Sequence, residues 1–306
     1  MTRPLDNNAP ARVALLFIDG LGWGEADPAV NPGWSYGGDH LRLPALPATG
    51  SSICLENGAW ARAIDACLGV DGLPQSATGQ TTLLTGVNAQ AVQGRHLSGF
   101  PGPTLRKVLL EHSLLKRLRE AGRRPVFFNT FRAPFFEWPR ERQLRMSATT
   151  VANLAADLPF FDVPDMAAGR SLYQEFTGHE LRALGFEVPL YTPAEAGAIL
   201  ARNISEWDFL LYEYFLTDKA GHTGDRAAAE AELVRLDAFL GAVLAGLPRN
   251  ALLLICSDHG NLEDLTVKTH TRNPVPLLAW GPGAEIFVGG IDRLDQVAPA
   301  IFSILT

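Results

Sequence analysis

The stretch VALLFIDGLG (Val13–Gly22) joins a run of apolar residues directly to an acidic residue and two glycines. Near-continuous apolar runs of this length are typical of strands that are covered on both faces, as in parallel sheets. We expect a strand over Val13–Asp19 and four further strands of the same character: PVFFNTF (Pro125–Phe131), DFLLYEY (Asp208–Tyr214), ALLLICSD (Ala251–Asp258) and VPLLAWG (Val275–Gly281).

Helical patterns lie between these apolar runs. Leu105–Ala121 has apolar residues at helical spacing, and Arg226–Leu247 places its apolar residues on one stripe. Thr192 and Pro193, followed by Glu195, resemble a helix start with proline at the first helical position. Alternating strands and helices predict an α/β fold with a mostly parallel sheet, in which ligands bind at the carboxyl ends of the strands.

The segment from Arg132 to Val188 interrupts this alternation. It is rich in Phe, Pro and Arg and has weak periodicity. We expect a small inserted cap over the sheet edge, with its phenylalanines packed on one another or on the rim of the core, because exposed apolar patches are disfavoured. The expected division is a core of residues 1–131 and 189–306 with a cap of residues 132–188.

The composition indicates a folded protein that does not bind nucleic acid. Of the 306 residues, 47% are hydrophobic and 19% are charged, which suits a large buried core. The formal net charge of -7 argues against nucleic acid as a partner, because phosphate contacts need clustered Lys and Arg. The chain has three cysteines and no CxxC spacing, so we expect neither a disulfide framework nor a thiolate metal cluster.

The N-terminal stretch MTRPLDNNAPAR lacks the apolar core of a signal peptide. The apolar run that follows it is far shorter than the roughly 20 residues that a membrane-spanning helix needs. We therefore expect a cytoplasmic protein without a membrane partner.

Acidic and histidine side chains gather at the predicted strand ends. They are Asp19, Asp218, His222, Asp258, His259 and His270. One Asp at a strand end is more often a turn or cap residue. An adjacent Asp-His pair after a buried strand is rarer, because two ionisable groups beside a core need a partner. Several such sites at successive strand ends predict metal binding, and mixed carboxylate and imidazole ligands suit Zn²⁺ or Mn²⁺.

A candidate nucleophile lies in LPQSATGQTTLLTG (Leu73–Gly86), where a Ser/Thr cluster leads into a short apolar helix. A hydroxyl at a helix N-terminus lies near free backbone N–H groups, which favour an anion there. Taken alone, this stretch is better explained as an ordinary helix N-cap, since Ser and Thr supply such caps in many proteins.

Five motifs, DGLG, QSATGQ, TDKAGHTG, SDHGN and THTRNPVP, occur in this order along the chain. Together they resemble the alkaline phosphatase superfamily, and specifically the metal domain of cofactor-independent phosphoglycerate mutase and its phosphopentomutase relatives. The resemblance covers the two ends of the chain and leaves its middle unmatched. It implies a three-layer α/β core and two divalent metal ions, Zn²⁺ or Mn²⁺, in each chain.

The resemblance also implies a role for each matched residue. One ion would be held by Asp218, His222 and His270. The other would be held by Asp19, Asp258 and His259, with the hydroxyl of Ser76 as a further ligand and as the nucleophile. Gln80 stands where the mutases have a His, after a matching Gly79, which puts one contact of that family in doubt. The rival nucleophiles are Thr78, Thr81 and Thr82. Ser76 is favoured because the third residue after it is Gly79, and we expect a glycine with positive φ at that position. If Thr78 were the nucleophile, Thr81 would stand at that position instead.

The implied reaction is phosphoryl transfer through a phosphoserine, with a small phosphorylated compound as substrate. We expect hydrolysis, because 306 residues leave no room for the large second domain of the glycerate mutases. A phosphomutase and a metal-binding domain without catalysis are the alternatives. Sulfate esters are disfavoured, because the C/S-x-P-x-R motif of the sulfatases is missing. Candidate substrate contacts are Arg132, Asn129 and Arg95, although a solvated charged surface explains such arginines equally well.

Overall fold

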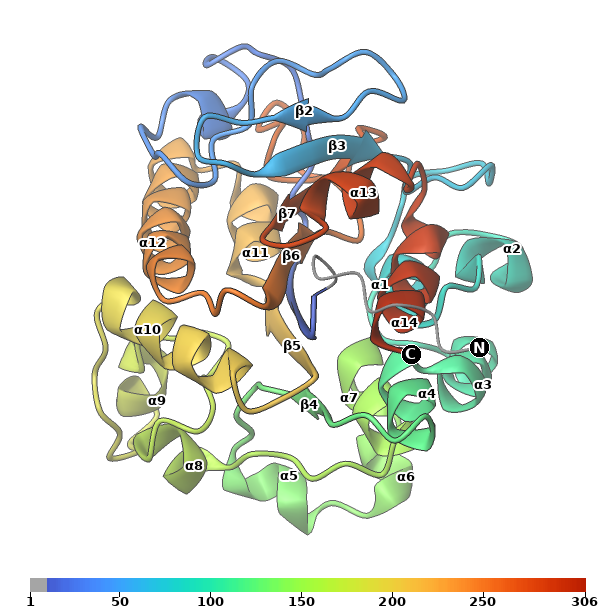
Figure 1. The fold of residues 1–306 in the computed structure, drawn as a ribbon, viewed down its shortest axis with the longest axis vertical. Helices are drawn as coiled ribbons and strands as arrows, with labels where there is room; N and C mark the ends of the chain where they lie inside the picture. The colour runs from blue at the N-terminus through green and yellow to red at the C-terminus, as the bar shows by residue number, and fades with distance from the viewer. Residues whose placement is uncertain (1–9) are drawn as a thin grey trace.

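The computed structural model describes residues 10–306, and residues 1–9, which hold most of the stretch MTRPLDNNAPAR, lie outside the described part. Within residues 10–306 the strands form one seven-stranded sheet in the order β2-β3-β7-β6-β1-β5-β4 (Figure 1). The strands are β1 (Arg12–Ile18), β2 (Ile53–Cys54), β3 (Trp60–Ile64), β4 (Pro125–Phe127), β5 (Phe209–Tyr214), β6 (Ala251–Cys256) and β7 (Val275–Trp280).

The sheet is mostly parallel, as its apolar strands predicted. Strand β1 lies between β5 and β6 and is parallel to both, and β4 continues the parallel part beyond β5. The other edge is antiparallel, because β7 pairs antiparallel with β6, and β3 pairs antiparallel with β7 and β2. Each of the five predicted strands is present. β4 is shorter than expected, since the side chain of Asn129 bonds the backbone N–H and C=O of Glu213 where the ladder ends.

Helices cover both faces of the sheet and give the core three layers (Figure 1). Successive residues of β1 point to opposite faces, so that Leu15 packs in one hydrophobic cluster and Leu16 in the other. The first cluster includes side chains of α1 (Ser76–Thr85), α3 (Pro103–His112), α4 (Leu114–Glu120), α7 (Ala148–Ala155), α13 (Ala284–Gly289) and α14 (Val297–Leu305). The second includes side chains of α10 (Pro193–Ile204), α11 (Leu216–Thr223) and α12 (Arg226–Ala245).

Helix α12 begins and ends close to its predicted bounds, α10 begins at the predicted proline, and the third predicted helix is broken. The Thr192 hydroxyl accepts from the backbone of Glu195 and completes a capping box, which starts α10 at Pro193. The helix expected over Leu105–Ala121 is instead two helices, α3 and α4. Ser113 leaves the helical conformation between them and caps α4 with its hydroxyl.

Residues 132–188, all of which the structure describes, contribute five helices and no strand to the sheet. Besides α7 these are α5 (Ala133–Glu137), α6 (Arg140–Gln143), α8 (Val163–Ala167) and α9 (His179–Ala183). The rings of Phe135 and Phe160 lie 4.8 Å apart, so the Phe-rich stretches FFEW and LPFFDV of this segment do pack on one another. Helix α7 packs in the main core with α3 and α4, and the division into core and cap stays a prediction.

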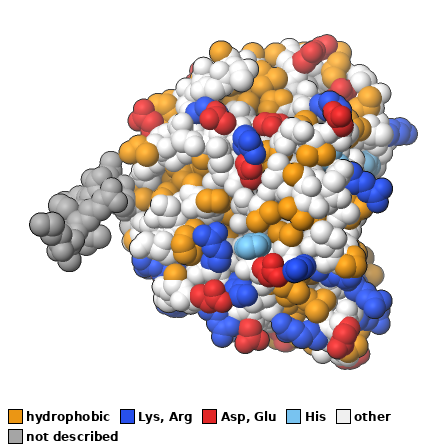
Figure 2. All heavy atoms as spheres, turned by 90° about the vertical axis from the view of Figure 1, so that its right-hand side faces the viewer, with side chains coloured by type: hydrophobic (Ala, Val, Ile, Leu, Met, Phe, Trp, Pro, Cys, Tyr) orange, Lys and Arg blue, Asp and Glu red, His pale blue; other side chains and the backbone are white. Residues whose placement is uncertain are grey.

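The remaining described elements are short: α2 (Ala89–Gln93), η1 (Pro32–Trp34) and η2 (Leu294–Gln296). Among residues 10–306, no helix has both the length and the apolar character needed to cross a membrane. Figure 2 shows one face of the molecule, on which acidic and basic side chains are interspersed with apolar ones.

Candidate metal centre

The carboxyl ends of three parallel strands bring the predicted ligands together. Asp19 follows β1 directly, Asp218 lies in the first turn of α11 just after β5, and Asp258 and His259 follow β6. His270 comes from the loop between β6 and β7. Because β6, β1 and β5 are neighbours in the sheet, these loops meet at one edge, as expected for ligand sites of open α/β sheets.

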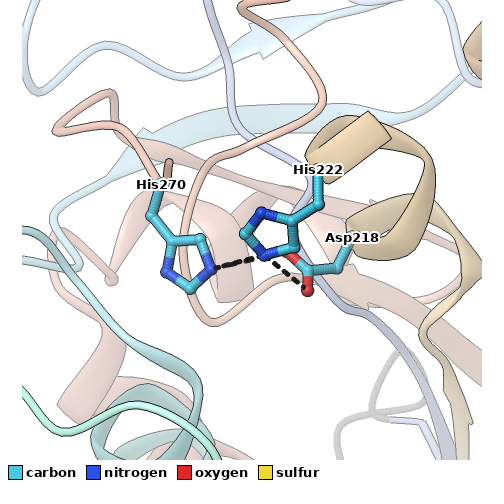
Figure 3. A group of neighbouring side chains, drawn as sticks. All are labelled: Asp218, His222 and His270. Atoms are coloured by element: carbon cyan, nitrogen blue, oxygen red, sulfur yellow. Dashed lines mark hydrogen bonds and ion pairs between the residues drawn. The ribbon is translucent and has the colours of Figure 1, made fainter. Parts of the chain in front are cut away.

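Asp218, His222 and His270 form the first ligand group (Figure 3). The Nε2 atoms of the two histidines are 3.3 Å apart. The Asp218 carboxylate lies 3.4 Å from His222 Nε2 and 3.6 Å from His270 Nε2. The spacing of Asp218 and His222 places both on one face of a helical turn, so α11 alone supplies two of the three residues of the group.

Both imidazoles of this group are oriented by backbone carbonyls. His222 Nδ1 lies 3.0 Å from the carbonyl oxygen of Lys268, and His270 Nδ1 lies 2.9 Å from that of Pro74. A proton on Nδ1 satisfies these contacts and leaves Nε2 free with its lone pair. Histidines that bind metal ions are commonly held in this way, which fixes the tautomer and the ring orientation.

Asp19, Asp258 and His259 form the second group, in which every side chain is buried. His259 Nε2 lies 3.3 Å from Asp19 Oδ1 and 3.4 Å from Asp258 Oδ2. The His259 ring stacks on the ring of His270 with centroids 3.6 Å apart. The two groups are therefore neighbours in one polar centre.

The second group has the donor chemistry that a divalent cation fits. Asp19 Oδ1 and Asp258 Oδ2 are buried and have no hydrogen-bond partner among the described residues. Burial, together with the charges of the neighbouring carboxylates, raises the pKa of Asp19 well above its usual range. Burial and the charge of Asp218 raise the pKa of Asp258 to about 7. A bound cation would satisfy both oxygens and remove the repulsion, since buried charges are normally paired or coordinate metals.

His259 is neutral in this environment. Burial, followed by the nearby His270, lowers the pKa of His259 to about 3. A neutral imidazole with an accessible nitrogen lone pair is the form that binds Zn²⁺ and Mn²⁺. The three residues of each group stand where the resemblance implied, and their role as ligands stays a prediction.

Ser76 contacts the second ligand group through its hydroxyl. It is the first residue of α1, and its Oγ lies 3.1 Å from His259 Nε2. Its side chain is half-buried and lines the cavity described below. Ser76 therefore lies beside the second ligand group and at a helix N-terminus, where the helix dipole favours an anion.

The three rival threonines use their hydroxyls inside the helix region. Thr78 Oγ1 donates to the carbonyl of Gln75, Thr81 Oγ1 to that of Ala77, and Thr82 Oγ1 to the side chain of Gln90. All three are buried. Their hydroxyls are thus occupied by structural hydrogen bonds, whereas the Ser76 hydroxyl contacts a candidate metal ligand.

The expected reason for a glycine at position 79 was wrong. Gly79 lies within α1 and is not one of the residues with positive φ. A Cβ at this position would lie 2.6 Å from the carbonyl oxygen of Asp258. Glycine is needed because the helix packs directly on the strand end that carries Asp258, and a larger side chain would push the two apart. Gly20, in contrast, does have positive φ (70°), and a Cβ there would meet Asp218.

Three supporting residues were missed as site residues by the sequence analysis. Gln80, at the position of the doubtful family contact, donates from Nε2 to Asp19 Oδ2 at 3.1 Å. Asn261 donates to Asp218 Oδ1 at 2.6 Å. The buried carboxylate of Glu263 accepts from the backbone N–H groups of Gly22 and Asn261, and from the side chains of Thr271 and Asn273. The sequence signals for the last two residues were that Asn261 ends the motif SDHGN and that Glu263 lies two residues beyond it.

Glu263 joins three loops that carry candidate ligands. Its carboxylate oxygens accept hydrogen bonds from the loop after β1, from the loop after β6 and from the segment just after His270. Every contact it makes is to a donor, so the carboxylate is the form that fits. Glu263 is therefore a positioning residue for the centre.

A cavity of about 460 Å³ opens beside the metal centre and is lined by Asp19, Ser76, Gln80 and Asp218 at that end. Arg132 and Asn129, two of the candidate substrate contacts, also line it, and their role as contacts stays a prediction. Both polar atoms of the Asn129 side chain bond the backbone of Glu213. Arg95 lines a different surface hollow, together with His96 and Asp71, and does not line this cavity.

Glu213 and Lys219 are further cavity residues that the sequence analysis did not single out. Burial raises the pKa of Glu213 to about 7, although a 2.6 Å hydrogen bond from the Thr149 hydroxyl opposes that rise. Lys219 Nζ lies 4.8 Å from the centre of the Phe215 ring. Within the described part of the chain, neither Lys219 nor Arg132 has a carboxylate within ion-pair distance, so both positive charges are available to an anionic ligand.

Part of the chain is similar in sequence to known proteins. Residues 191–306 match the Metalloenzyme superfamily. The 2,3-bisphosphoglycerate-independent phosphoglycerate mutase of Acetivibrio thermocellus is 38% identical over 111 residues, which are 34% of this chain and 21% of that protein. The enzyme of the same description in Desulforudis audaxviator is 37% identical over 113 residues, 34% of this chain and 22% of that protein. The match thus spans about a fifth of the length of these curated relatives.

Solved structures resemble the chain over nearly its whole length. A cold-active alkaline phosphatase from a psychrophilic Shewanella species superposes with a TM-score of 0.54 at 12% identity, covering 96% of this chain and all (100%) of the other. The alkaline phosphatase of the Antarctic bacterium TAB5 gives a TM-score of 0.50 at 14% identity, with 97% and 98% covered. Likeness at such low identity is a likeness of fold.

Proposed function

Because this chain has an alkaline phosphatase-like fold and resembles the metalloenzyme superfamily, as its motifs predicted, we propose that it is a two-metal phosphoryl-transfer enzyme. Its reaction is the hydrolysis of a small phosphate ester through a phosphoserine at Ser76. The two metal sites are Asp218, His222 and His270, and Asp19, Asp258 and His259.

One observation carries this proposal: the Ser76 hydroxyl lies 3.1 Å from His259 Nε2, next to two buried carboxylate oxygens without partners. A serine whose hydroxyl only capped a helix would have no reason to lie in such a centre. Conversely, a structural ion would not need a half-exposed hydroxyl that faces a cavity. The combination of a cation site and an accessible hydroxyl is that of metal-activated nucleophiles.

Divalent ions in these groups would lower the pKa of a coordinated hydroxyl and stabilise negative charge on phosphoryl oxygens. The protein side chains fix where that chemistry occurs. The backbone carbonyls of Lys268 and Pro74 hold the Nε2 atoms of His222 and His270 toward the centre. Gln80 and Asn261 each orient one carboxylate of the two groups. The mixed nitrogen and oxygen donors suit Zn²⁺ or Mn²⁺.

The reaction then has two steps. Ser76 Oγ loses its proton and forms a bond to phosphorus, while the bond from phosphorus to the ester oxygen breaks and the alcohol leaves with a proton. Water next attacks the phosphoserine, so that inorganic phosphate leaves and the Ser76 hydroxyl is restored. Lys219 and Arg132, which line the same cavity, bind phosphoryl oxygens of the substrate.

Transfer to a second hydroxyl in place of water would make the protein a phosphomutase. The relatives named phosphoglycerate mutases favour this alternative, and the full-length similarity in fold to alkaline phosphatases favours hydrolysis. The two reactions share the site and the phosphoserine, and only the products separate them. The expected partner is a small phosphorylated substrate, with neither nucleic acid nor membrane, and the expected location is the cytoplasm.

The test is a metal and activity analysis of the purified protein. We expect elemental analysis to find two divalent ions for each chain after dialysis against Zn²⁺ or Mn²⁺. We expect metal-dependent release of inorganic phosphate from at least one member of a panel of phosphate mono- and diesters. Dialysis against a chelator should remove both the ions and the activity, and either ion should restore the activity. The control is Ser76→Ala treated in the same way.

Three outcomes separate the alternatives. Phosphate recovered on a second hydroxyl of the substrate, with none released to water, would establish a mutase. Two bound ions with no turnover of any ester would support a metal-binding domain without catalysis. One bound ion, with Asp19 and Asp258 unliganded, would contradict the two-metal centre.

A further inference from the structure

We propose, on the basis of the phosphoryl-transfer function above, that the substrate is a phosphate ester whose alcohol carries a planar aromatic ring. The ring would lie against an aromatic wall of the cavity while the phosphoryl group reaches the metal centre. The cavity has two chemically different ends, and this division is what the proposal rests on.

One end of the cavity is polar and contains the catalytic groups. Asp19, Ser76 and Asp218 line it there, and Lys219 follows Asp218 directly. Seven of the other lining residues are aromatic and come from four separate segments of the chain. They are Phe100, Phe127, Phe131, Phe135, Trp138, Tyr173 and Phe215.

The aromatic wall is a set of rings that hold one another in place. Phe131 lies 4.4 Å from Phe135 between ring centres, and each packs on Phe160 behind them at 4.7 and 4.8 Å. Trp138 lies 6.0 Å from Phe135, and the guanidinium of Arg142 lies over its ring at 4.0 Å. Rings packed in this way have little freedom to lose when a ligand binds, which favours binding of a flat apolar group.

Phe100 adds a ring on a separate segment, between α2 and α3. It lines the same cavity and is nevertheless 58% exposed. An exposed phenylalanine at the edge of an aromatic cavity offers apolar surface that a ligand would bury favourably. Phe136 is also exposed, at 45%, but does not line the cavity, and it therefore serves as a control position below.

The size of the cavity agrees with a substrate larger than a phosphate. A cavity of about 460 Å³ lies within the range of about 300–1,000 Å³ that is usual for small-molecule sites. A substrate such as glycerol phosphate would leave the rings in contact with water. Sugar hydroxyls placed against this wall would lose hydrogen bonds to water that aromatic rings do not replace. An aromatic ring would cover the rings of the wall, and it has no hydroxyl groups that lose hydrogen bonds to water.

Two kinds of compound share this chemistry: an ester of a simple aromatic alcohol, and a nucleoside phosphate, whose base is the ring. The aromatic wall recognises the planar ring in both. Polar side chains also line the cavity, among them Thr130, Ser147, Thr150 and Gln174, and they do not decide between the two kinds. The experiment is therefore arranged so that the two kinds are measured separately.

The experiment compares two matched pairs of substrates with the metal-loaded protein. Benzyl phosphate is paired with propyl phosphate, since the two alcohols leave about equally well. Adenosine 5′-monophosphate is paired with ribose 5-phosphate, which differs by the base. We expect kcat/KM to be about tenfold higher for the ring-bearing member of one pair, because ring packing favours binding beyond area burial. The pair that responds identifies the kind of compound.

Variants test whether the aromatic wall causes the preference. Trp138→Ala and Phe100→Ala are each expected to lower the ratio of kcat/KM between the ring-bearing and ringless members by about fivefold to tenfold. Phe136→Ala, on the exposed neighbouring position, is expected to leave this ratio unchanged. Two variants on separate segments are used so that poor folding of one does not decide the result.

Binding supplies a readout that does not depend on turnover. Benzylphosphonate and propylphosphonate, which cannot be hydrolysed, are titrated into the protein by calorimetry, and we expect the benzyl compound to bind at least about tenfold more tightly. Phosphate release from both members of each pair at equal rates, with equal phosphonate affinities, would overturn the ring preference and leave the proposed function intact. Failure to hydrolyse any ester would contradict the proposed function, and the phosphonate affinities would still decide the ring preference.

Discussion

Asp258→Asn tests whether the second ligand group exists for a cation or for the fold. In the metal-free protein, burial and the charge of Asp218 raise the pKa of Asp258 from 3.8 to about 7. This rise corresponds to roughly 4 kcal/mol at about 1.36 kcal/mol for each pKa unit. The ionised carboxylate therefore costs up to about 4 kcal/mol of the free energy of unfolding, because the folded state prefers the protonated form.

The pH dependence follows from the sign of this effect. The pKa of Asp258 is higher in the folded state than in the unfolded state, so the folded state binds the proton more tightly. In the metal-free protein, the contribution of Asp258 to the free energy of unfolding is greatest below about pH 4. This contribution is lost as the pH rises through 7. Asparagine carries no charge at any of these pH values, so the variant should lose less stability over the same range.

A bound metal ion should reduce or reverse the difference in stability between the two proteins. An ion at 100 times its dissociation constant stabilises the folded state by about 2.7 kcal/mol. The wild type should gain this stability, and the variant should gain little of it because one of three protein ligands is lost. We therefore expect Asp258→Asn to be more stable than the wild type with a chelator at pH 7.5, by up to about 4 kcal/mol. With Mn²⁺ present, the difference should shrink or change sign.

The assay is urea unfolding followed by circular dichroism at pH 5 and pH 7.5, with a chelator and with Mn²⁺. Asp71→Asn, at an exposed carboxylate away from the centre, serves as the control and should behave like the wild type. The reasoning is refuted if Asp258→Asn destabilises the metal-free protein at pH 7.5 and responds to Mn²⁺ as strongly as the wild type does. That result would make Asp258 a structural residue.

Three further substitutions follow from the geometry. Ser76→Ala should keep both ions by elemental analysis, since each ion retains three protein ligands. The variant should release phosphate at least about 10³ times more slowly than the wild type. Turnover near the wild-type rate would exclude Ser76 as the nucleophile. Glu263→Gln should lower the free energy of unfolding by about 3 kcal/mol in urea, because the NH2 group of the new glutamine would face two hydrogen-bond donors. Glu187→Gln, at an exposed position, is the control and should change the free energy of unfolding little. Equal stabilities of the two variants would contradict the positioning role of Glu263. Gly79→Ala should destabilise the protein by about 1–3 kcal/mol, because the new Cβ would lie 2.6 Å from a backbone oxygen. Gly289→Ala, at a helical position with open space around it, is the control and should not destabilise the protein. An unchanged stability of Gly79→Ala would refute the close packing at this position.

The parallel core of the fold could be predicted from the sequence because its strands are buried on both faces. Continuous apolar runs such as Val13–Asp19 have no other simple explanation when helical patterns alternate with them. The short strands β2 and β3 gave no such signal. An apolar run also carries no information about direction, so the antiparallel pairing of β7 could not be predicted.

The candidate ligands could be predicted because charged and imidazole groups beside apolar strand ends are unusual. The supporting residues could not. Glu263 forms its hydrogen bonds with Gly22 and Thr271, and these residues become its neighbours only when the loops fold together. In the same way, Arg95 and Arg132 look alike in the sequence, and only the fold places Arg132 in the cavity.

The most direct test of the central claim is to trap the phosphoryl group on the protein. Metal-loaded protein is mixed with a substrate identified in the ester panel, quenched in acid within one turnover, digested and analysed by mass spectrometry. The account predicts one phosphate on the peptide that contains Ser76, located on Ser76 itself, and none after the same treatment of Ser76→Ala. Phosphate on Thr78 or another residue, or turnover of the ester with no phosphorylated peptide, would contradict it.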